Sequence, residues 1–386
     1  MPRLFYPNFE FEDELAGRPI NHDVLSALRK SLADIWLAIA EPGECVFDRD
    51  GLIQPVNQRS PFPVIATLNE PQLTNRHGCF ELFPWGWSES CLQFADRFGV
   101  EANAPSLVDV RQINERQYGF DFEIDHNIGL DGMAAIKTPE EFVETVTRLV
   151  QRLGDDPNSI GWILKPQLSA SGRHCLRGRG LPGEQQRSWV TKRTDGQNTL
   201  FLEPHVECVR EAGFQFWIDD AVRFDGCVEM ITDTNGQYRG SIARPSIEPI
   251  WSDTLMWCTR LAEQIRRRGY FGPLGIDSMV YRHSDGQMKH RPVQDVNGRY
   301  TMGRVALGLR RFVERDETLV WVHCDAQRPE AVLEQLATHF PFARRIVVAS
   351  STTTAVEIRK LPVLVVVSAD VQTDELLSIT HLLFAG

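Results

Sequence analysis

The sequence has few of the features that mark several large classes of protein. Its eight cysteines are scattered and form no CxxC pair. A zinc site or a disulfide framework is therefore not expected, and the reduced thiols of a cytosol fit better. The longest apolar runs, Ile35–Ala40 and Val363–Val367, are far shorter than the ~20 residues that cross a bilayer. The start of the chain also lacks a signal-peptide pattern. We therefore expect a cytoplasmic protein without a membrane partner.

Positive charge is also scarce. The chain has 52 acidic and 41 basic residues and a net charge of -11. Because binding to a nucleic-acid backbone needs a dominant positive field, no nucleic-acid partner is expected. The P-loop motif GxxxxGK[ST] is absent. The stretch Gly178–Gly183 satisfies GxGxxG, but Pro182 and the missing strand-to-helix context argue against a dinucleotide site.

The length of the chain predicts more than one domain. Its 386 residues exceed the ~250–300 at which one hydrophobic core usually stops growing. Changes of pattern divide it into an N-terminal domain at 1–105, a middle domain at 106–312 and a small C-terminal α/β extension at 313–386. In the first region we expect a helix at Val24–Ala40 with Asp23 as its cap, and a short strand after the connector at 100–110.

Strands and helices alternate in the rest of the chain. Thr138, Pro139 and Glu141 form a strong helix start. Further patterns predict strands in GWILKP (161–166) and TLFLEPHV (199–206), helices at Ser252–Arg268, Pro329–His339 and Thr373–Leu383, and a hairpin that turns around Ser284–Gly286.

The predicted hairpin carries an unusual row of polar side chains. Asp295, Asn297 and Arg299 fall on one face of its second strand because side chains alternate with a period of two. Folding the hairpin brings Asp277 roughly opposite Val293–Asp295. Two carboxylates and an amide oxygen suit Mg²⁺, and Arg299 could bind a phosphate oxygen. For these four residues alone, a solvated strand face with a surface ion pair is an equal alternative.

A lysine and a loop of small residues precede this hairpin. Lys165 stands at the end of GWILKP, and the next segment begins QLSASG. The backbone N–H groups of Ser169–Gly172 could cover phosphates. A lone lysine or a lone Ser/Gly loop is usually only basic surface. A strand, a lysine, a flexible loop, an acidic segment and a carboxylate hairpin in this order are much less common by chance.

With these motifs, residues 110–312 resemble the ATP-grasp superfamily, most closely in the hairpin segment 272–306. The resemblance implies an α+β ATP-grasp fold, in which two lobes hold ATP, with an N-terminal α/β domain before it and a small C-terminal α/β extension after it. It also implies ligation of a carboxylate to an amine through an acyl phosphate.

The resemblance assigns roles to residues by position. Lys165 would bind the α and β phosphates and Arg116, where relatives often have lysine, would also contact phosphate. Asp295 stands where relatives most often carry glutamate. The implied nucleotide ligands are Arg116, Lys165, the lid residues Ser169, Ser171 and Gly172, the adenine ligands Glu203 and Val206, and the ribose ligand Glu211. The implied metal ligands are Asp277, Asp295 and Asn297, and the catalytic cations are Arg299 and Lys165.

The expected cofactors are ATP and Mg²⁺, with Mn²⁺ as an alternative metal. The expected partners are a small-molecule carboxylate and a small-molecule amine, and a homodimer stays open. Two other functions remain: a phosphotransferase on the same fold, and a non-catalytic nucleotide-binding protein. Arg223, Arg239 and Arg244 are candidates for holding a substrate carboxylate, whereas Trp85 and Trp87 are expected to pack in the core.

Overall fold

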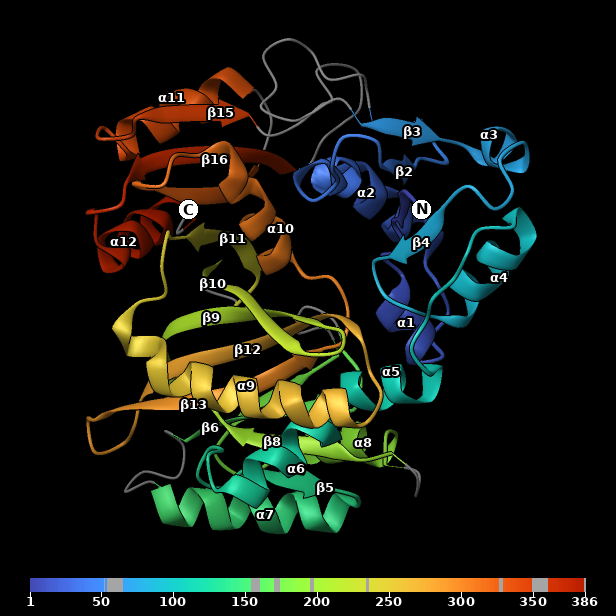
Figure 1. Cartoon of the computed structure of the whole chain (residues 1–386). Helices are drawn as coiled ribbons and strands as arrows, with labels where there is room; N and C mark the ends of the chain where they lie inside the picture. The colour runs from blue at the N-terminus through green and yellow to red at the C-terminus, as the bar shows by residue number, and fades with distance from the viewer. Residues whose placement is uncertain are drawn as a thin grey trace.

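The fold is given by a computed structural model of the chain. It describes residues 1–51, 53, 65–153, 160–169, 174–194, 198–233, 236–325, 329–348 and 360–384. Three sheets with their helices form an N-terminal domain, a small lobe and a large lobe (Figure 1). The N-terminal domain lies to one side of the large lobe. The small lobe lies below the large lobe in that view.

The N-terminal domain is a parallel α/β unit. Its sheet has the order β3-β2-β1-β4. The strands are β1 (Arg3–Tyr6), β2 (Cys45–Phe47), β3 (Ala66–Leu68) and β4 (Glu81–Pro84), and the helices are α1 (Phe11–Leu15), α2 (His22–Leu32), the 3-10 helix η1 (Ala33–Ala38), α3 (Glu70–Thr74) and α4 (Glu89–Phe98). The predicted helix at 24–40 is thus two shorter helices. Asp23 is not its cap, because α2 already begins at His22 and the Asn21 side chain accepts from the Asp23 N–H at 3.1 Å.

Two helices connect this domain to the small lobe. They are α5 (Leu107–Asn114) and α6 (Arg116–His126). Helix α5 begins inside the predicted connector at 100–110 and α6 follows it, so the short strand predicted after that connector is wrong. Val110 and Ile113 are fully buried three residues apart, which is the spacing of a helix face.

The small lobe is a four-stranded antiparallel sheet covered by helices. The sheet order is β5-β8-β6-β7. Its elements are β5 (Ala134–Ile136), α7 (Pro139–Leu153), β6 (Gly161–Pro166), β7 (Leu176–Arg179), α8 (Glu184–Thr191) and β8 (Leu200–Pro204). The predicted start of α7 is confirmed, because Thr138 Oγ1 accepts from the Glu141 N–H at 3.1 Å. Lys165 lies at the end of β6, as predicted.

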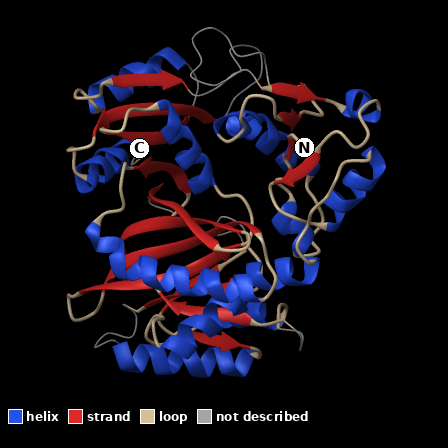
Figure 2. Ribbon diagram, in the orientation of Figure 1, coloured by secondary structure: helices blue, strands red, loops and turns tan. Residues whose placement is uncertain are grey.

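The large lobe is built on an eight-stranded sheet with the order β13-β12-β9-β10-β11-β14-β16-β15. Helix α9 packs along the half of this sheet that ends in the predicted hairpin (Figures 1 and 2). The elements of this half are β9 (Glu207–Ile218), β10 (Val222–Thr232), β11 (Tyr238–Ala243), η3 (Pro249–Trp251), α9 (Ser252–Arg267), β12 (Gly272–Arg282), β13 (Met288–Asn297), α10 (Met302–Leu309) and η4 (Arg310–Phe312).

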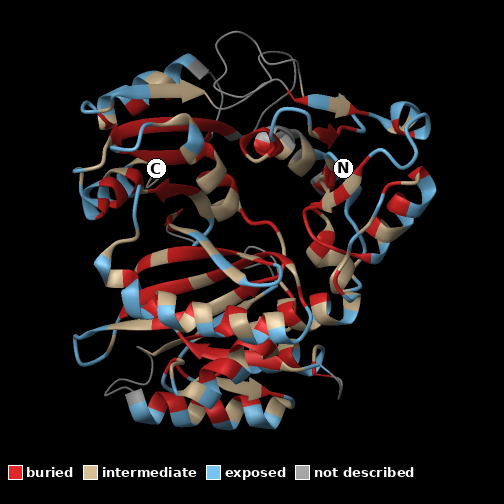
Figure 3. Ribbon diagram, viewed as in Figure 1, coloured by how far each residue is buried: buried red, intermediate tan, exposed pale blue. Residues whose placement is uncertain are grey.

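The C-terminal segment continues the same sheet. Its elements are β14 (Glu317–Asp325), α11 (Pro329–His339), β15 (Arg345–Val348), β16 (Lys360–Ser368) and α12 (Thr373–Leu383). Strand β14 pairs antiparallel with β11, so backbone hydrogen bonds join the extension to the large lobe. Ile231 and Ile242 of the large lobe share a buried core with this segment, and Figure 3 shows the buried strands of the sheet. In the described part of the chain, no helix is long and apolar enough to span a membrane.

Candidate functional site

The two strands of the predicted hairpin bring its polar residues together. Asp277 on β12 lies directly opposite Asp295 on β13. Asn297 Nδ2 donates to Asp277 Oδ2 at 3.1 Å, and Arg299 Nη2 donates to Asn297 Oδ1 at 2.9 Å. The turn is closed by the His283 N–H, which donates to the Gln287 carbonyl at 2.8 Å. The register predicted from the sequence is therefore confirmed, and the four polar side chains form one cluster.

Asp277 lies beside a second carboxylate, and its printed side-chain partner is the neutral Asn297 amide. Burial, and then the charge of Asp295, raise the pKa of Asp277 to about 7. A divalent cation would remove this penalty, so the oxygen atoms present fit a magnesium ion. No group of three or more His, Cys, Asp or Glu side chains that could hold a metal occurs among the described residues. The protein ligands available here are two carboxylates and one amide, which leaves positions for water and phosphate oxygens.

Arg116 connects this cluster to the small lobe. Its Nη2 lies 3.5 Å from Asp295 Oδ2 and donates to Ser169 Oγ at 3.2 Å. Its Nη1 is buried without a hydrogen-bond partner among the described residues. Because an unsatisfied buried donor is costly, this N–H group is suited to an anionic ligand such as a phosphate. Ser171 and Gly172, which were predicted beside Ser169, lie outside the described residues.

A buried ion network surrounds Lys165 and Glu203. Lys165 Nζ lies 2.6 Å from Glu203 Oε2. Arg291 donates to both oxygens of Glu203, from Nη1 at 2.8 Å and from Nη2 at 3.1 Å. On its other side Arg291 donates to both oxygens of Glu123, each at 2.8 Å. The network joins helix α6, the small lobe and strand β13, and it contains two anions and two cations.

The charges in this network shift one another's pKa values. Burial would raise the pKa of Glu203, but Arg291 and Lys165 hold it well below its usual range. Burial raises the pKa of Glu123, against the opposing effect of Arg291. The arginine therefore stays charged and ties Glu203 in place. The sequence analysis missed Arg291 and Glu123, although Arg291 stands in the same alternating row as Val293 and Asp295.

Two further predicted residues, Glu211 and Val206, have other contacts. Glu211 on β9 accepts from Gln294 Nε2 at 3.1 Å, and its charge also contributes to the raised pKa of Asp277. Val206 packs against an apolar cluster that includes Leu130 and Met279. Of the predicted site residues that the structure describes, Arg116 contacts Ser169 and Asp295, and Lys165 contacts Glu203. Arg116, Glu203 and Asp295 line one small cleft.

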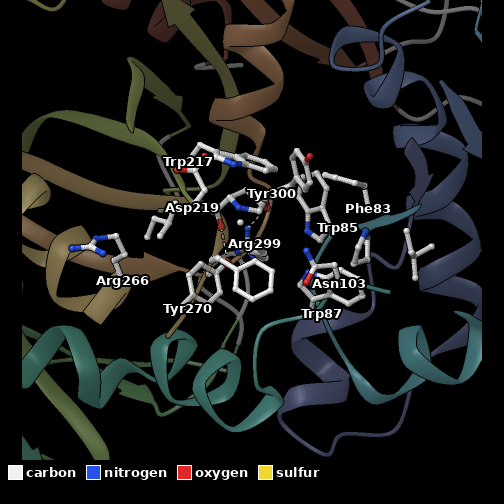
Figure 4. Close-up of a pocket in the computed structure, with 18 of the residues that line it drawn as sticks. Phe83, Trp85, Trp87, Asn103, Trp217, Asp219, Arg266, Tyr270, Arg299 and Tyr300 are labelled. Atoms are coloured by element: carbon white, nitrogen blue, oxygen red, sulfur yellow. Dashed lines mark hydrogen bonds between the residues drawn. The ribbon is translucent and has the colours of Figure 1, made fainter. Parts of the chain in front are cut away.

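A second cavity lies on the other side of Arg299. It has a volume of about 520 Å³ and is formed by residues 81–87 and Asn103 of the N-terminal region together with residues 217–220, 269–273 and 298–300 of the large lobe. Figure 4 shows aromatic rings from both sides around Arg299. Arg299 Nη1 donates to the Tyr300 carbonyl at 2.9 Å, and its Nε lies 2.6 Å from Glu12 Oε1. Arg299 thus contacts the carboxylate cluster through Asn297 and also lines this cavity.

The two tryptophans predicted to pack in the core have a second role. Trp85 and Trp87 are largely buried, yet both line the cavity. In contrast, the three arginines proposed for a substrate carboxylate are not among the residues that line it. Each is paired near its own strand: Arg223 with Asp225, Arg239 with Asp233 and Arg244 with Glu248.

No protein-family model and no curated protein sequence matches the chain. Solved structures do match it. An N5-carboxyaminoimidazole ribonucleotide synthetase in complex with ADP has a TM-score of 0.57 and 14% identity, with 100% of this chain and 97% of that chain covered. The corresponding synthase from Aspergillus clavatus, with ADP and 5-aminoimidazole ribonucleotide, has a TM-score of 0.52 and 13% identity, with 99% of each chain covered.

A carboxylase domain is similar to the chain at the same level. The biotin carboxylase domain of the Hydrogenobacter thermophilus 2-oxoglutarate carboxylase, a dimer with MgADP, ADP and bicarbonate, has a TM-score of 0.54 and 13% identity. The match covers 96% of this chain and 86% of that chain. At such low identities these similarities establish the fold, and they extend over the N-terminal domain and the C-terminal extension as well as the two lobes.

Proposed function

We propose that this chain, which has the ATP-grasp fold predicted from its sequence, is an ATP-dependent ligase that joins a small carboxylate to an amine. One observation carries the proposal: between the lobes, Asp277, Asp295 and Asn297 adjoin the cations Arg116 and Arg299. Such a cluster suits a metal and a transferring phosphoryl group. The proposed division of the chain is 1–105 for the N-terminal domain, 106–312 for the ATP-grasp domain and 313–386 for the extension.

The proposed ligands for Mg²⁺ are Asp277, Asp295 and Asn297. When bound, the ion would neutralise charge on the β and γ phosphates of ATP. Lys165 has three N–H donors and uses one toward Glu203, so the others can reach phosphate oxygens. Arg116 offers its unpaired Nη1 to the same anion.

The remaining nucleotide contacts are proposed from position. Among the described residues, Glu203 Oε1 accepts from Arg291, and its other lone pair could accept from the adenine amino group. Val206 would contribute backbone contacts and Glu211 would hold the ribose, with Ser169, Ser171 and Gly172 in the lid. The cleft beside Arg116, Glu203 and Asp295 measures only about 10 Å³. We therefore expect the lobes to separate when ATP enters and to close again over it.

Arg299 would stabilise the acyl phosphate. Two of its four Nη hydrogens are donated to the Tyr300 carbonyl and to Asn297 Oδ1, and its Nε lies 2.6 Å from Glu12 Oε1 in an ion pair, which restricts the orientation of the guanidinium. The other two can donate to the oxygens of the transferring phosphoryl group. Because this geometry is preorganised, it favours the charge that develops in the transition state. Closure of the lobes would keep water away from the acyl phosphate, which hydrolyses readily.

Substitution of Lys165 tests the nucleotide site. Lys165→Ala should weaken ATP binding by at least roughly tenfold and abolish turnover, because one phosphate cation is lost. Isothermal titration calorimetry measures the affinity, and Lys192→Ala, at an exposed position on the end of α8, is the control. Unchanged affinity in Lys165→Ala would remove this residue from the site.

A screen of ADP release against pooled carboxylates and amines tests the reaction. A ligase releases ADP and phosphate only when both a carboxylate and an amine are supplied, and the product contains both. A stable phosphorylated product without consumption of an amine would instead show a phosphotransferase. Binding of ATP without turnover on any pair would favour the non-catalytic alternative.

A further inference from the structure

The 520 Å³ cavity has the size of a small-molecule site. It lies between the N-terminal domain and the large lobe, whereas the proposed nucleotide cleft lies between the large and small lobes. Arg299 connects the cavity with the nucleotide cleft, because it lines the cavity and also donates to Asn297 of the proposed metal site. A molecule in the cavity would therefore have its reactive end near the transferring phosphoryl group.

Aromatic rings line this cavity from both of its sides. Trp85 and Trp87 come from the N-terminal domain, and Trp217 and Tyr270 come from the large lobe (Figure 4). The rings of Phe83 and Trp217, one from each side, are nearly parallel, with an interplanar angle of 14° and centroids 6.4 Å apart. Such flat apolar faces favour a planar ring, because stacked and edge-to-face contacts add to the burial of apolar area.

The charges around the cavity are mainly acidic. Its lining includes the carboxylates of Glu81, Asp219 and Asp220 and only two cations, Arg266 and Arg299. Each of these cations already has an anionic neighbour. Arg266 Nε lies 3.0 Å from Glu263 Oε2, and Arg299 Nε lies 2.6 Å from Glu12 Oε1. The surplus of negative charge disfavours an anionic ligand, and together with the aromatic faces it favours an ammonium group.

The N-terminus of helix α4, which begins just after Gly86 and Trp87 of the cavity lining, is not available to bind a phosphate group. The start of a helix is a common phosphate site because its N–H groups are free. Here the Glu14 carboxylate occupies that place. It accepts from the Ser90 N–H at 2.8 Å and from Ser90 Oγ at 2.6 Å. These N–H donors at the start of α4 are therefore already taken by a carboxylate of the protein.

From these contacts we propose that the cavity binds the amine substrate, and that this amine carries a planar aromatic ring and no phosphate. Its role as the nucleophile rests on the proposed ligase function. In that reaction the bound ammonium first loses one proton to water, and the neutral nitrogen then attacks the acyl carbon of the acyl phosphate. A C–N bond forms, the C–O bond to phosphate breaks, and the nitrogen's proton goes to the departing phosphate.

Matched ligands test the class of molecule directly, by calorimetry without nucleotide. Pyridoxamine and pyridoxamine 5′-phosphate differ only in the phosphate, phenethylamine and 3-phenylpropionate carry opposite charges, and cyclohexylethylamine lacks the planar ring. We expect phenethylamine and pyridoxamine to bind at least roughly tenfold more tightly than their acidic, phosphorylated or saturated counterparts. Equal or tighter binding of any of those counterparts would overturn the proposal.

Variants locate the binding. Trp217→Leu and Trp87→Leu should each weaken phenethylamine binding by roughly fivefold to tenfold. Trp189→Leu is a matched control, because Trp189 is also half-buried beside an arginine but lies on α8 in the small lobe. Equal affinity of the wild type and the three variants for phenethylamine would place the amine elsewhere and refute the cavity as its binding site. If the amines bind in the cavity but ADP is never released with any carboxylate, the ligase function fails while the ligand class stands.

Discussion

The buried ion network gives a prediction that can be worked out in detail. Arg291→Met removes the cation that lies between Glu123 and Glu203. The side chains of all three residues are 5% exposed or less. Lys165 then remains as the cation of the network, and within the described part of the chain its ion pair is with Glu203. Glu123 is left as an uncompensated buried charge.

The expected cost is large. Removing one partner of a buried pair typically destabilises a protein by about 3–5 kcal/mol. The urea dependence rises with protein size, and at about 3 kcal/mol per molar for a chain of this length the midpoint of unfolding should fall by roughly 1–2 M. The loss of stability in Arg291→Met should become smaller as the pH is lowered toward the ordinary pKa of a glutamate. Burial already raises the pKa of Glu123, so this residue can then be protonated in the folded protein.

Equilibrium urea unfolding of a double variant separates the charge effect from lost packing. Glu123→Leu combined with Arg291→Met removes one anion and one cation and leaves the Lys165–Glu203 pair at 2.6 Å. It should be more stable than Arg291→Met alone by about 1–3 kcal/mol. A loss below about 1 kcal/mol in the single variant, or strictly additive losses in the double variant, would refute the account of this network.

Two further predictions concern the metal site and the C-terminal extension. Asp295→Asn should lower Mg²⁺ affinity and turnover severely because an anionic ligand becomes neutral, whereas Asp295→Glu keeps the charge and should retain activity. Equal Mg²⁺ affinities of the two variants in a titration would contradict the assignment. Burial, and then Arg239, lower the pKa of His323 to about 4. Its neutral form should therefore contribute about 3 kcal/mol of stability above pH ~6.5, lost as the pH falls toward 4, and His323→Phe should flatten this part of the stability–pH curve measured by urea unfolding.

The hairpin could be predicted from the sequence because its determinants are local. The alternation around Asp295 and Asn297 has the period of a strand, and Ser284–Gly286 supply a turn. These two facts fix which residues lie opposite each other, so Asp277 and Asp295 were placed correctly. The start of α7 was also predictable, because its capping residue Thr138 stands beside the first helical turn.

The ion network could not be predicted in the same way. Glu123 and Arg291 are separated by 168 residues and meet only because helix α6 packs against β13. The segment before α6 was expected to form a strand, so no helix face was available from which to place Glu123. The alternating row on β13 did contain a signal, since Arg291 shares it with the buried Val293. A cation in a buried row requires a nearby anion, although the sequence does not say which one.

The second cavity shows why the N-terminal domain belongs to the proposed active site. Glu12 on α1 contacts Arg299, and the Tyr300 N–H donates to the Trp85 carbonyl at 2.9 Å. The domain therefore supplies one wall of the cavity and also one of the three groups that orient the Arg299 guanidinium. A lysine at this position could not contact Glu12, Tyr300 and Asn297 through fixed planar donors while leaving two donors for a phosphoryl group. The orientation of Arg299 thus depends on how the N-terminal domain packs, which links occupancy of the cavity to the chemistry proposed on the other side of this arginine.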